Sequence, residues 1–292
     1  MLDHANITEY ELDCIRFYMG DPEIVNRGDF EGDGKAYNTI NALLHYGTWD
    51  ETEKIREGKR IELFSVSHLE KYIRLILEIF YAMEKFVNED INDHMNDHLV
   101  TYRIDRYSAI KHLKDKNYIE GFYSTCKNGF LEEYAHTKLG IVLMEIHRNA
   151  NVPYLDFERL FHSAYAKPQE AEILLPFGAQ IVEIEEVELS EEERIRYTDI
   201  DGNVPEGKYR IVISNKEDIT MDDMDPDELY GYITSNETFD HAIECIYKLM
   251  KQEALSDEEF SFYTEWKENV QLYINQKISL KHKELNTFKS VK

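Results

Sequence analysis

The sequence predicts an α+β protein in which helices come first, a sheet core follows and a helical segment ends the chain. Apolar residues recur at three- and four-residue spacing in the first hundred residues and again after residue 235, which is typical of helices. Between Leu99 and Ser214 the apolar runs are short and often alternate with polar residues, which is typical of strands. The chain has 292 residues, 42% of them hydrophobic, enough for a sizeable core.

Three helices are expected near the N-terminus, over residues 7–19, over 36–45 and from Ser67 onward. Ser67-His68-Leu69-Glu70 has the pattern of a capping box. Apolar residues at helical spacing follow it: Leu69, Tyr72, Ile73, Ile76, Leu77, Phe80 and Met83. The loop 28–34 is rich in Gly and Asp, but Ile40 stands where a calcium loop needs its final Glu, so we do not expect calcium there.

Seven strands are expected in the middle of the chain. They are residues 99–104, 120–125, 139–147, 171–176, 180–187, 194–198 and 209–214. The last two flank Asp201-Gly202 and Gly207, which predicts a long hairpin. After an acidic stretch, helices are expected over residues 235–250 and 257–285. This organisation predicts a domain over residues 1–215, made of helices over residues 1–98 and a sheet core over residues 99–215, followed by an acidic linker and helical extension over residues 216–292.

Charge and composition exclude several classes of protein. The formal net charge is −25 and the pI is about 4.8, which argues against a protein that binds nucleic acid or an anionic membrane. No window approaches the roughly 20 apolar residues of a membrane span, and the N-terminus lacks the pattern of a signal peptide. We therefore expect a soluble protein made in the cytoplasm, and leave open export by another route. The oligomeric state stays open.

Two carboxylates stand one residue apart, Glu170 and Glu172, where an apolar run begins. On a strand these positions share a face, and like charges so close raise each other's pKa, so the pair indicates a functional site. Two predicted strands upstream also carry polar groups, Arg103 on one and Ser124-Thr125 on the other.

The order Arg, then Ser-Thr, then Glu-x-Glu resembles the Arg-Ser-Glu class of mono-ADP-ribosyltransferases, which includes the cholera-toxin-like and binary-toxin-like enzymes. The resemblance covers about residues 8–213. Residues 35–44 resemble a helical pattern of that family, with Ala36 in place of a glycine, and Cys126 stands where the family usually has serine. The resemblance implies an ADP-ribosyltransferase-like fold, with a mainly antiparallel two-sheet core around an NAD cleft, and NAD as substrate.

The resemblance also implies a role for each site residue. Glu172 would stabilise the oxocarbenium-like transition state formed when the nicotinamide–ribose bond breaks, and Ser124 would orient it. Glu170 would deprotonate an acceptor arginine, and Tyr165 would help recognise the acceptor protein. Contacts to NAD would come from Tyr102, Arg103, Ser124, Thr125 and either Lys138 or Arg148.

The resemblance further implies that Arg103, Ser124 and Glu172 converge in one cleft, with Glu170 at its rim. No metal site is expected. His94 and His98 lie four apart beside Asp93 and Asp97, but without a third ligand we interpret this segment as a solvated helix end.

The function predicted from these residues is transfer of ADP-ribose from NAD to a protein arginine with release of nicotinamide, as in a bacterial effector or toxin. One alternative is an NAD glycohydrolase on the same fold. Another is a catalytically inactive acidic interaction module. Retention of Arg103, Ser124, Glu170 and Glu172 together argues against that last alternative. The acceptor protein stays open.

Overall fold

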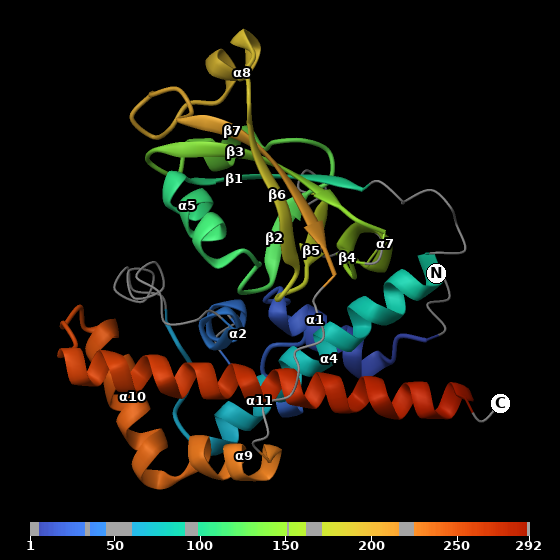
Figure 1. The fold of residues 1–292 in the computed structure, drawn as a ribbon, viewed down its shortest axis with the longest axis vertical. Helices are drawn as coiled ribbons and strands as arrows, with labels where there is room; N and C mark the ends of the chain where they lie inside the picture. Colours follow the sequence, from blue (N-terminus) through green and yellow to red (C-terminus); the bar gives the residue numbers. More distant parts are fainter. Residues whose placement is uncertain are drawn as a thin grey trace. The chain divides into compact units, whose positions relative to one another are not determined.

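The computed structural model describes residues 6–32, 36–44, 60–90, 99–150, 152–161, 171–215 and 225–290. The chain packs into two compact units (Figure 1). One contains Ala82–Glu217 together with the N-terminal residues up to Ile7, and the other combines Thr8–Tyr81 with Asp218–Lys292. The structure thus groups the N-terminal helices with the C-terminal ones, whereas the sequence-based division puts them with the sheet. The boundary at residue 215 stays a prediction about domains.

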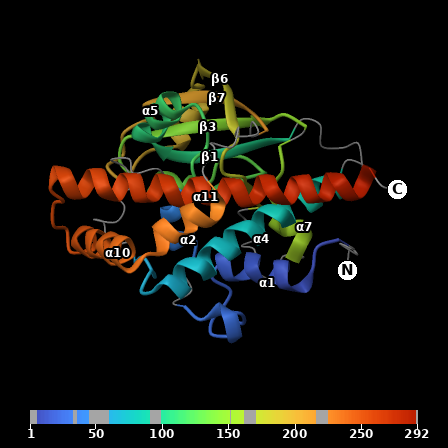
Figure 2. The same ribbon diagram turned by 60° about the horizontal axis from the view of Figure 1, so that its bottom comes forward.

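The second unit is helical (Figure 2). Its elements are α1 (Glu9–Tyr18), η1 (Gly28–Phe30), α2 (Ala36–Leu44), α4 (Val66–Asp90, which the unit boundary divides), α9 (Pro226–Thr234), α10 (Asn236–Met250) and α11 (Asp257–Ser290). Helix α11 contacts α2, α9 and α10. Trp266 of α11 is fully buried, and its Nε1 donates to the carbonyl of Ile233 at 3.1 Å. None of the described helices combines the length and apolar content needed to cross a lipid bilayer.

Helices α1, α2, α4, α10 and α11 confirm the predicted helical segments, but the predicted start of α4 is wrong. The helix begins at Val66, and the hydroxyl of Ser65 accepts the His68 N–H at 3.3 Å. Ser65 is therefore the N-cap. Ser67 lies in the first turn instead, where its hydroxyl is 2.8 Å from that of Ser65.

Within its described residues, the first unit is built on seven strands. They are β1 (Val100–Arg106), β2 (Tyr123–Cys126), β3 (Ile141–Arg148), β4 (Leu155–Asp156), β5 (Glu172–Leu175), β6 (Gln180–Val187) and β7 (Gly207–Ser214). Their order is β4-β5-β2-β1-β3-β7-β6, and among these strands only β3 and β7 pair in parallel. The mixed α+β class and the mainly antiparallel core are confirmed. The predicted pair of sheets is instead one hydrogen-bonded sheet.

This sheet has a narrow joint between its third and fourth strands. Strands β1 and β2 pair at one position, Tyr102 opposite Cys126, whereas β1 and β3 pair over seven positions. In Figure 1, β2 and β5 run across the direction of β1 and β3. The sheet thus divides into a β4-β5-β2 half and a β1-β3-β7-β6 half that diverge from this joint.

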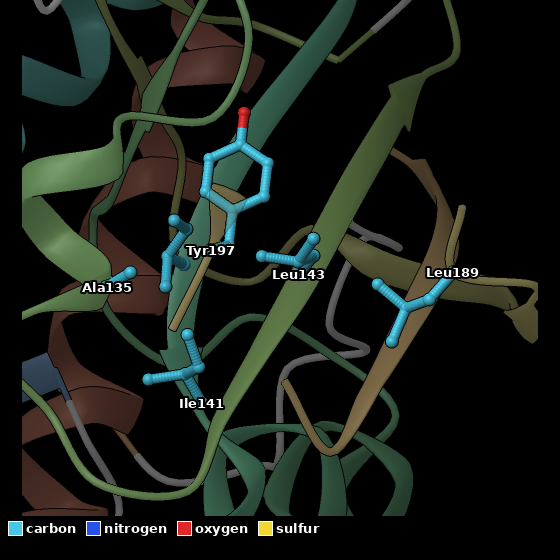
Figure 3. Packing of buried hydrophobic residues seen from close by; sticks show 6 residues of the cluster. Ala135, Ile141, Leu143, Leu189 and Tyr197 are labelled. Carbon is cyan, nitrogen blue, oxygen red and sulfur yellow. The ribbon is translucent and has the colours of Figure 1, made fainter. Parts of the chain in front are cut away.

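One face of β1 and β3 is closed by an apolar cluster (Figure 3). Its buried members are Ile104, Ala135, Ile141, Leu143, Leu189 and Tyr197, against which Phe130 and Tyr134 pack. Burial of a side chain such as Leu143 contributes about 1.5–3 kcal/mol to stability. The cluster therefore holds β1, the strand that carries Arg103, in place.

The predicted strand over 194–198 is wrong, because this segment contains the helix α8 (Glu191–Arg196). Ser190 and Glu193 form a capping box at its start. Three glutamates in the first turn and two arginines in the last also match the helix dipole. Strand β7 consequently has no hairpin partner in this segment and pairs with β3 and β6.

The sequence-based prediction also missed short elements of this unit. They are α5 (Tyr107–Lys116), α6 (Glu132–Ala135), α7 (Phe157–Phe161) and β4.

Candidate functional site

The hydroxyl of Ser124 donates a hydrogen bond to Glu172 Oε1 at 2.6 Å. Strands β2 and β5 pair with Cys126 opposite Glu172 and with Ser124 opposite Leu174, so Ser124 and Glu172 are diagonal neighbours on one face. Both side chains are half-buried. The two side chains are therefore in direct contact, and a catalytic role for this contact stays a prediction of the resemblance.

Ala171 interrupts the extended backbone just before Glu172. Its φ angle is +38°, a left-handed value that alanine rarely adopts, and strand β5 begins only at Glu172. Glu170 and Glu172 share a face only where the backbone is extended through Ala171, and this φ angle shows that it is not. The premise of the predicted pair is therefore wrong. Glu170 itself lies outside the described residues.

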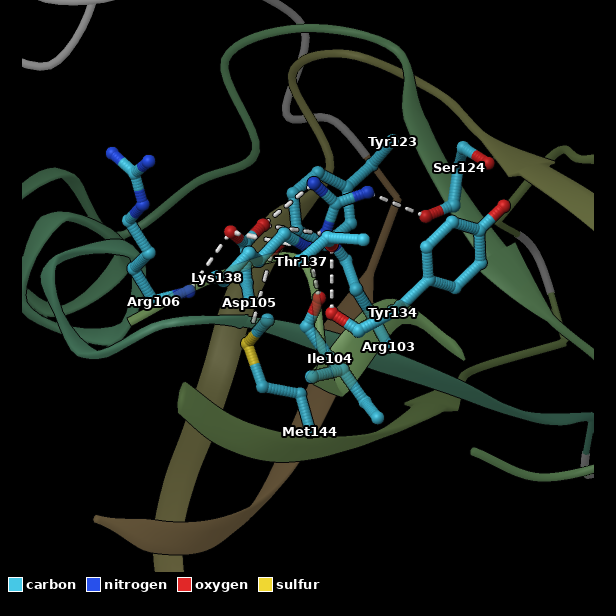
Figure 4. Close-up of polar contacts among 10 residues, drawn as sticks. All are labelled: Arg103, Ile104, Asp105, Arg106, Tyr123, Ser124, Tyr134, Thr137, Lys138 and Met144. Carbon is cyan, nitrogen blue, oxygen red and sulfur yellow. Dashed lines mark hydrogen bonds and ion pairs between the residues drawn. The ribbon is translucent and has the colours of Figure 1, made fainter. Parts of the chain in front are cut away.

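Polar contacts and an aromatic ring hold Arg103 of β1 (Figure 4). Its Nε and Nη2 donate to Asp105 Oδ2 at 2.8 and 2.6 Å, and its Nη1 donates to the carbonyl oxygen of Ser124 at 2.7 Å. The guanidinium lies 4.1 Å from the centre of the Tyr123 ring. Only 26% of the Arg103 side chain is exposed. Asp105 and Tyr123 thus fix the orientation of this guanidinium.

Arg103 and Glu172 are joined through the backbone of Ser124. Tyr102 pairs with Cys126 and therefore shares a face with Glu172. Arg103, the next residue of β1, points to the opposite face, where Tyr123 also lies. In Figure 4 the carbonyl oxygen of Ser124 points toward the guanidinium and its hydroxyl points away. Arg103 and Glu172 are thus linked by hydrogen bonds through Ser124, but their side chains do not meet on one face of the sheet. Convergence of the three residues in one cleft stays a prediction.

The two candidates for a second phosphate contact differ in their surroundings. Lys138 Nζ donates to the carbonyl of Ile104 at 2.6 Å and lies 3.9 Å from Asp105 Oδ1, beside Arg103 (Figure 4). Arg148 is 5% exposed.

Arg148 Nη1 donates to the carbonyls of Ala150 and Val152 at 3.0 and 2.7 Å. The Arg148 guanidinium lies 4.5 Å from the centre of the Tyr154 ring. Of the two candidates, Lys138 lies beside Arg103 and Asp105, whereas Arg148 supports the turn after β3.

The other predicted site residues have structural contacts or lie outside the described ranges. Tyr102 packs edge-on against Phe130, with ring centres 5.1 Å apart. Thr125 is buried, and its hydroxyl donates to the carbonyl of Ile173 at 2.9 Å. Residues outside the described ranges are Tyr165, Glu170, His94 and His98. A metal site built from three His, Cys, Asp or Glu side chains is absent from the residues that the structure describes.

Three residues around the site were missed by the sequence analysis. Asp105 has a recognisable pattern, because it stands two residues after Arg103 and a strand places both on one face. Lys127 Nζ and Asp156 Oδ2 form an ion pair at 2.9 Å. This pair depends on β4, which no pattern in the sequence predicts.

Tyr123 stays a neutral phenol. Burial raises its pKa well above the usual value of a tyrosine, which outweighs the lowering by Arg103. Its hydroxyl faces Met144 Sδ at 3.8 Å. The ring therefore offers the Arg103 guanidinium a stacking surface and not a counter-charge.

A toxin of known structure is similar to this chain. The crystal structure of the ADP-ribosylating toxin BECa, from a binary enterotoxin of C. perfringens and solved with NADH, is 18% identical to this chain, with a TM-score of 0.39. The match covers 72% of this chain and 44% of that one, so this chain spans less than half the length of BECa. No protein-family model matches the sequence. A search of curated proteins also finds no match.

Proposed function

We propose that the protein is an NAD-dependent mono-ADP-ribosyltransferase with an ADP-ribosyltransferase-like fold, which transfers ADP-ribose to a protein arginine. The observation that supports this best is the 2.6 Å hydrogen bond from the Ser124 hydroxyl to Glu172. The resemblance requires this serine to orient this carboxylate. These two residues are 48 positions apart, and the pairing of β2 with β5 is what makes them neighbours.

The chemistry needs a fixed carboxylate beside the reacting ribose. The bond between the ribose carbon and the nicotinamide nitrogen breaks, its electron pair leaves with nicotinamide, and positive charge builds on the ribose. A preoriented Glu172 stabilises this charge more in the transition state than in the ground state, which accelerates the step. Ser124 holds the carboxylate in place before the charge develops.

Arginine specificity is assigned to Glu170. A charged guanidinium is a poor nucleophile, so its nitrogen must lose a proton to a nearby base as it bonds to the ribose carbon. Glu170 is the base in this proposal, and Tyr165 contacts the acceptor protein. A role as a bacterial effector or toxin belongs to the same proposal.

A second candidate function is NAD glycohydrolysis on the same site. Water needs less help than arginine to attack the cation, so this reaction depends on Glu172 and Ser124 alone. Both of these residues lie in the described part of the chain and contact each other, and this contact favours hydrolysis as the second candidate.

The test is to incubate the purified full chain with NAD, with and without the arginine analogue agmatine, and to measure nicotinamide release and agmatine modification. We expect both, and we expect Glu172→Gln to reduce both by about a hundredfold, as loss of a key electrostatic group does. The matched control is Glu188→Gln, at an exposed position of the same unit. Nicotinamide release without agmatine modification indicates the glycohydrolase, and no release contradicts the proposal.

A further inference from the structure

We propose that the ion pair between Lys127 and Asp156 is a positioning device for Glu172, acting through the backbone of Ala171. The inference rests on the proposed function, because it concerns the carboxylate assigned to NAD cleavage. Neither Lys127 nor Asp156 belongs to the set of residues that the resemblance identifies.

The conformation of Ala171 is the first observation. Its φ angle is +38° and its side chain is buried. A left-handed conformation is unfavourable for alanine because its Cβ crowds the backbone. Such a conformation persists where the surrounding structure determines it, so the neighbours of Ala171 should include groups that hold it.

Lys127 holds Ala171 from one side. Its backbone N–H donates to the carbonyl oxygen of Ala171 at 3.0 Å. Lys127 directly follows Cys126, the last residue of β2, which pairs with Glu172. The hydrogen bond therefore continues the pairing of β2 with β5 by one residue beyond the start of β5.

Asp156 completes the arrangement from the other side of β5. It belongs to β4 and pairs with Ile173, and its Oδ2 lies 2.9 Å from Lys127 Nζ. The Asp156 side chain is only 3% exposed. Its other oxygen, Oδ1, accepts the Arg159 N–H at 3.1 Å at the start of α7. The pair thus spans from β2 to β4 across the residues that flank Glu172.

This arrangement matters for catalysis because Glu172 is the first residue of its strand. Its carboxylate meets the Ser124 hydroxyl at 2.6 Å, and the backbone directly before it is that of the strained Ala171. Misplacement of a catalytic group by about 1 Å can reduce a rate by about a hundredfold. Without the ion pair, Ala171 can relax toward an ordinary conformation and carry Glu172 away from Ser124.

The test compares Lys127→Met and Asp156→Asn, alone and combined, in the full chain. We expect each single change to lower kcat for NAD cleavage about tenfold, with the KM for NAD within about twofold of the wild type. The double variant should be no worse than the poorer single variant, because the two residues act as one unit. Lys127→Arg should restore most of the kcat. Lys111→Met, at an exposed position in α5, is the matched control.

A second variant separates positioning from mere support of the fold. Glycine adopts positive φ without strain, so with Ala171→Gly the left-handed conformation no longer depends on the ion pair. Asp156→Asn should then lower kcat less in the Ala171→Gly protein than in the wild type. Wild-type kcat in both single variants of the ion pair would overturn the proposal, and so would an equal loss of kcat from Asp156→Asn with and without Ala171→Gly. An effect of those ion-pair variants on KM alone would overturn it as well.

Hydrogen exchange separates this inference from the proposed function. The amide of Lys127 should exchange faster in Asp156→Asn than in the wild type, whether or not NAD is cleaved. Unchanged exchange at Lys127 overturns the positioning device. A wild-type protein that leaves NAD intact overturns the proposed function instead.

Discussion

The side chains of Arg103 and Glu172 leave the sheet on opposite faces, and the backbone carbonyl of Ser124 joins them. Arg103 donates to that carbonyl at 2.7 Å, while the Ser124 hydroxyl donates to Glu172 at 2.6 Å. Strands β1 and β2 pair only at Tyr102 and Cys126, and the guanidinium meets the Ser124 carbonyl close to this joint. Arg103 thus holds the residue whose hydroxyl is hydrogen-bonded to Glu172.

This geometry predicts how substitution of Arg103 changes the kinetics. Arg103→Gln should lower kcat for NAD cleavage about tenfold or more and leave the KM for NAD nearly unchanged, because the contact with Ser124 is lost. Steady-state kinetics over a range of NAD concentrations measures the split. A large rise in KM with unchanged kcat would instead favour the direct phosphate contact that the resemblance implies. Arg106→Gln, at an exposed residue of the same strand, is the control.

Ser124→Ala should reduce NAD cleavage less than Glu172→Gln does. One hydrogen bond to a charged group contributes about 1.5–3 kcal/mol, which corresponds to roughly a ten- to hundredfold change in rate. Ser124→Thr keeps a hydroxyl and should retain more activity than the alanine variant. Rates of nicotinamide release for the three variants test this order. A Ser124→Ala protein with wild-type activity would show that the hydroxyl has no role in the reaction.

Glu170→Gln should separate transfer from hydrolysis. In the proposed mechanism Glu170 accepts a proton from the acceptor and does not act on NAD, so the change should abolish agmatine modification and preserve much of the NAD hydrolysis. Both activities are assayed on one preparation with agmatine present. An equal loss of both would mean that Glu170 supports Glu172, and the inferred arginine specificity would have no basis.

The elements that the sequence predicts correctly are those with a strong local pattern. Helices α10 and α11 have apolar residues at helical spacing, and β6 and β7 have alternating ones. Segment 194–198 alternates weakly, and this period predicts a strand. The capping box of Ser190 and Glu193 starts a helix there instead, so a local hydrogen-bond pattern outweighs the apparent period.

The site is predictable in its order but not in its geometry. The distance between Ser124 and Glu172 along the chain does not show which residues of their two strands lie opposite each other. Only the pairing of β2 with β5 makes them neighbours. The left-handed Ala171 cannot be anticipated, because alanine has no preference for that conformation. The ion pair of Lys127 and Asp156 depends on β4, a two-residue strand without a pattern of its own.

The C-terminal helices should be necessary for the helical unit to fold. Trp266 is fully buried in α11 and hydrogen-bonded to Ile233 in α9, and Gln271 donates to the carbonyl of Leu44 at the end of α2. Replacing a buried Trp by Ala typically costs about 3–5 kcal/mol. Trp266→Ala should therefore lower the stability of the protein by about this amount, measured by urea unfolding. Tyr247→Ala, at a position 38% exposed in α10, should lower the stability far less. Equal losses of stability in the two variants would contradict the structural role given to Trp266.

The start of α11 should show a pH-dependent contribution from Glu259. A hydrogen bond from Lys248, followed by one from the backbone of Ser256, lowers the pKa of Glu259 to about 2. Because the folded pKa lies below the ordinary value of a glutamate, ionised Glu259 stabilises the fold above about pH 4.5, and this contribution is lost as the pH falls toward 2. Glu259→Gln should therefore lower the melting temperature most near pH 6, and the difference from the wild type should shrink between about pH 4.5 and 2.5. Glu258→Gln, exposed in the same turn, tests whether a general helix-dipole effect is responsible, since an equal pH dependence in that variant would remove the role of the Lys248 ion pair.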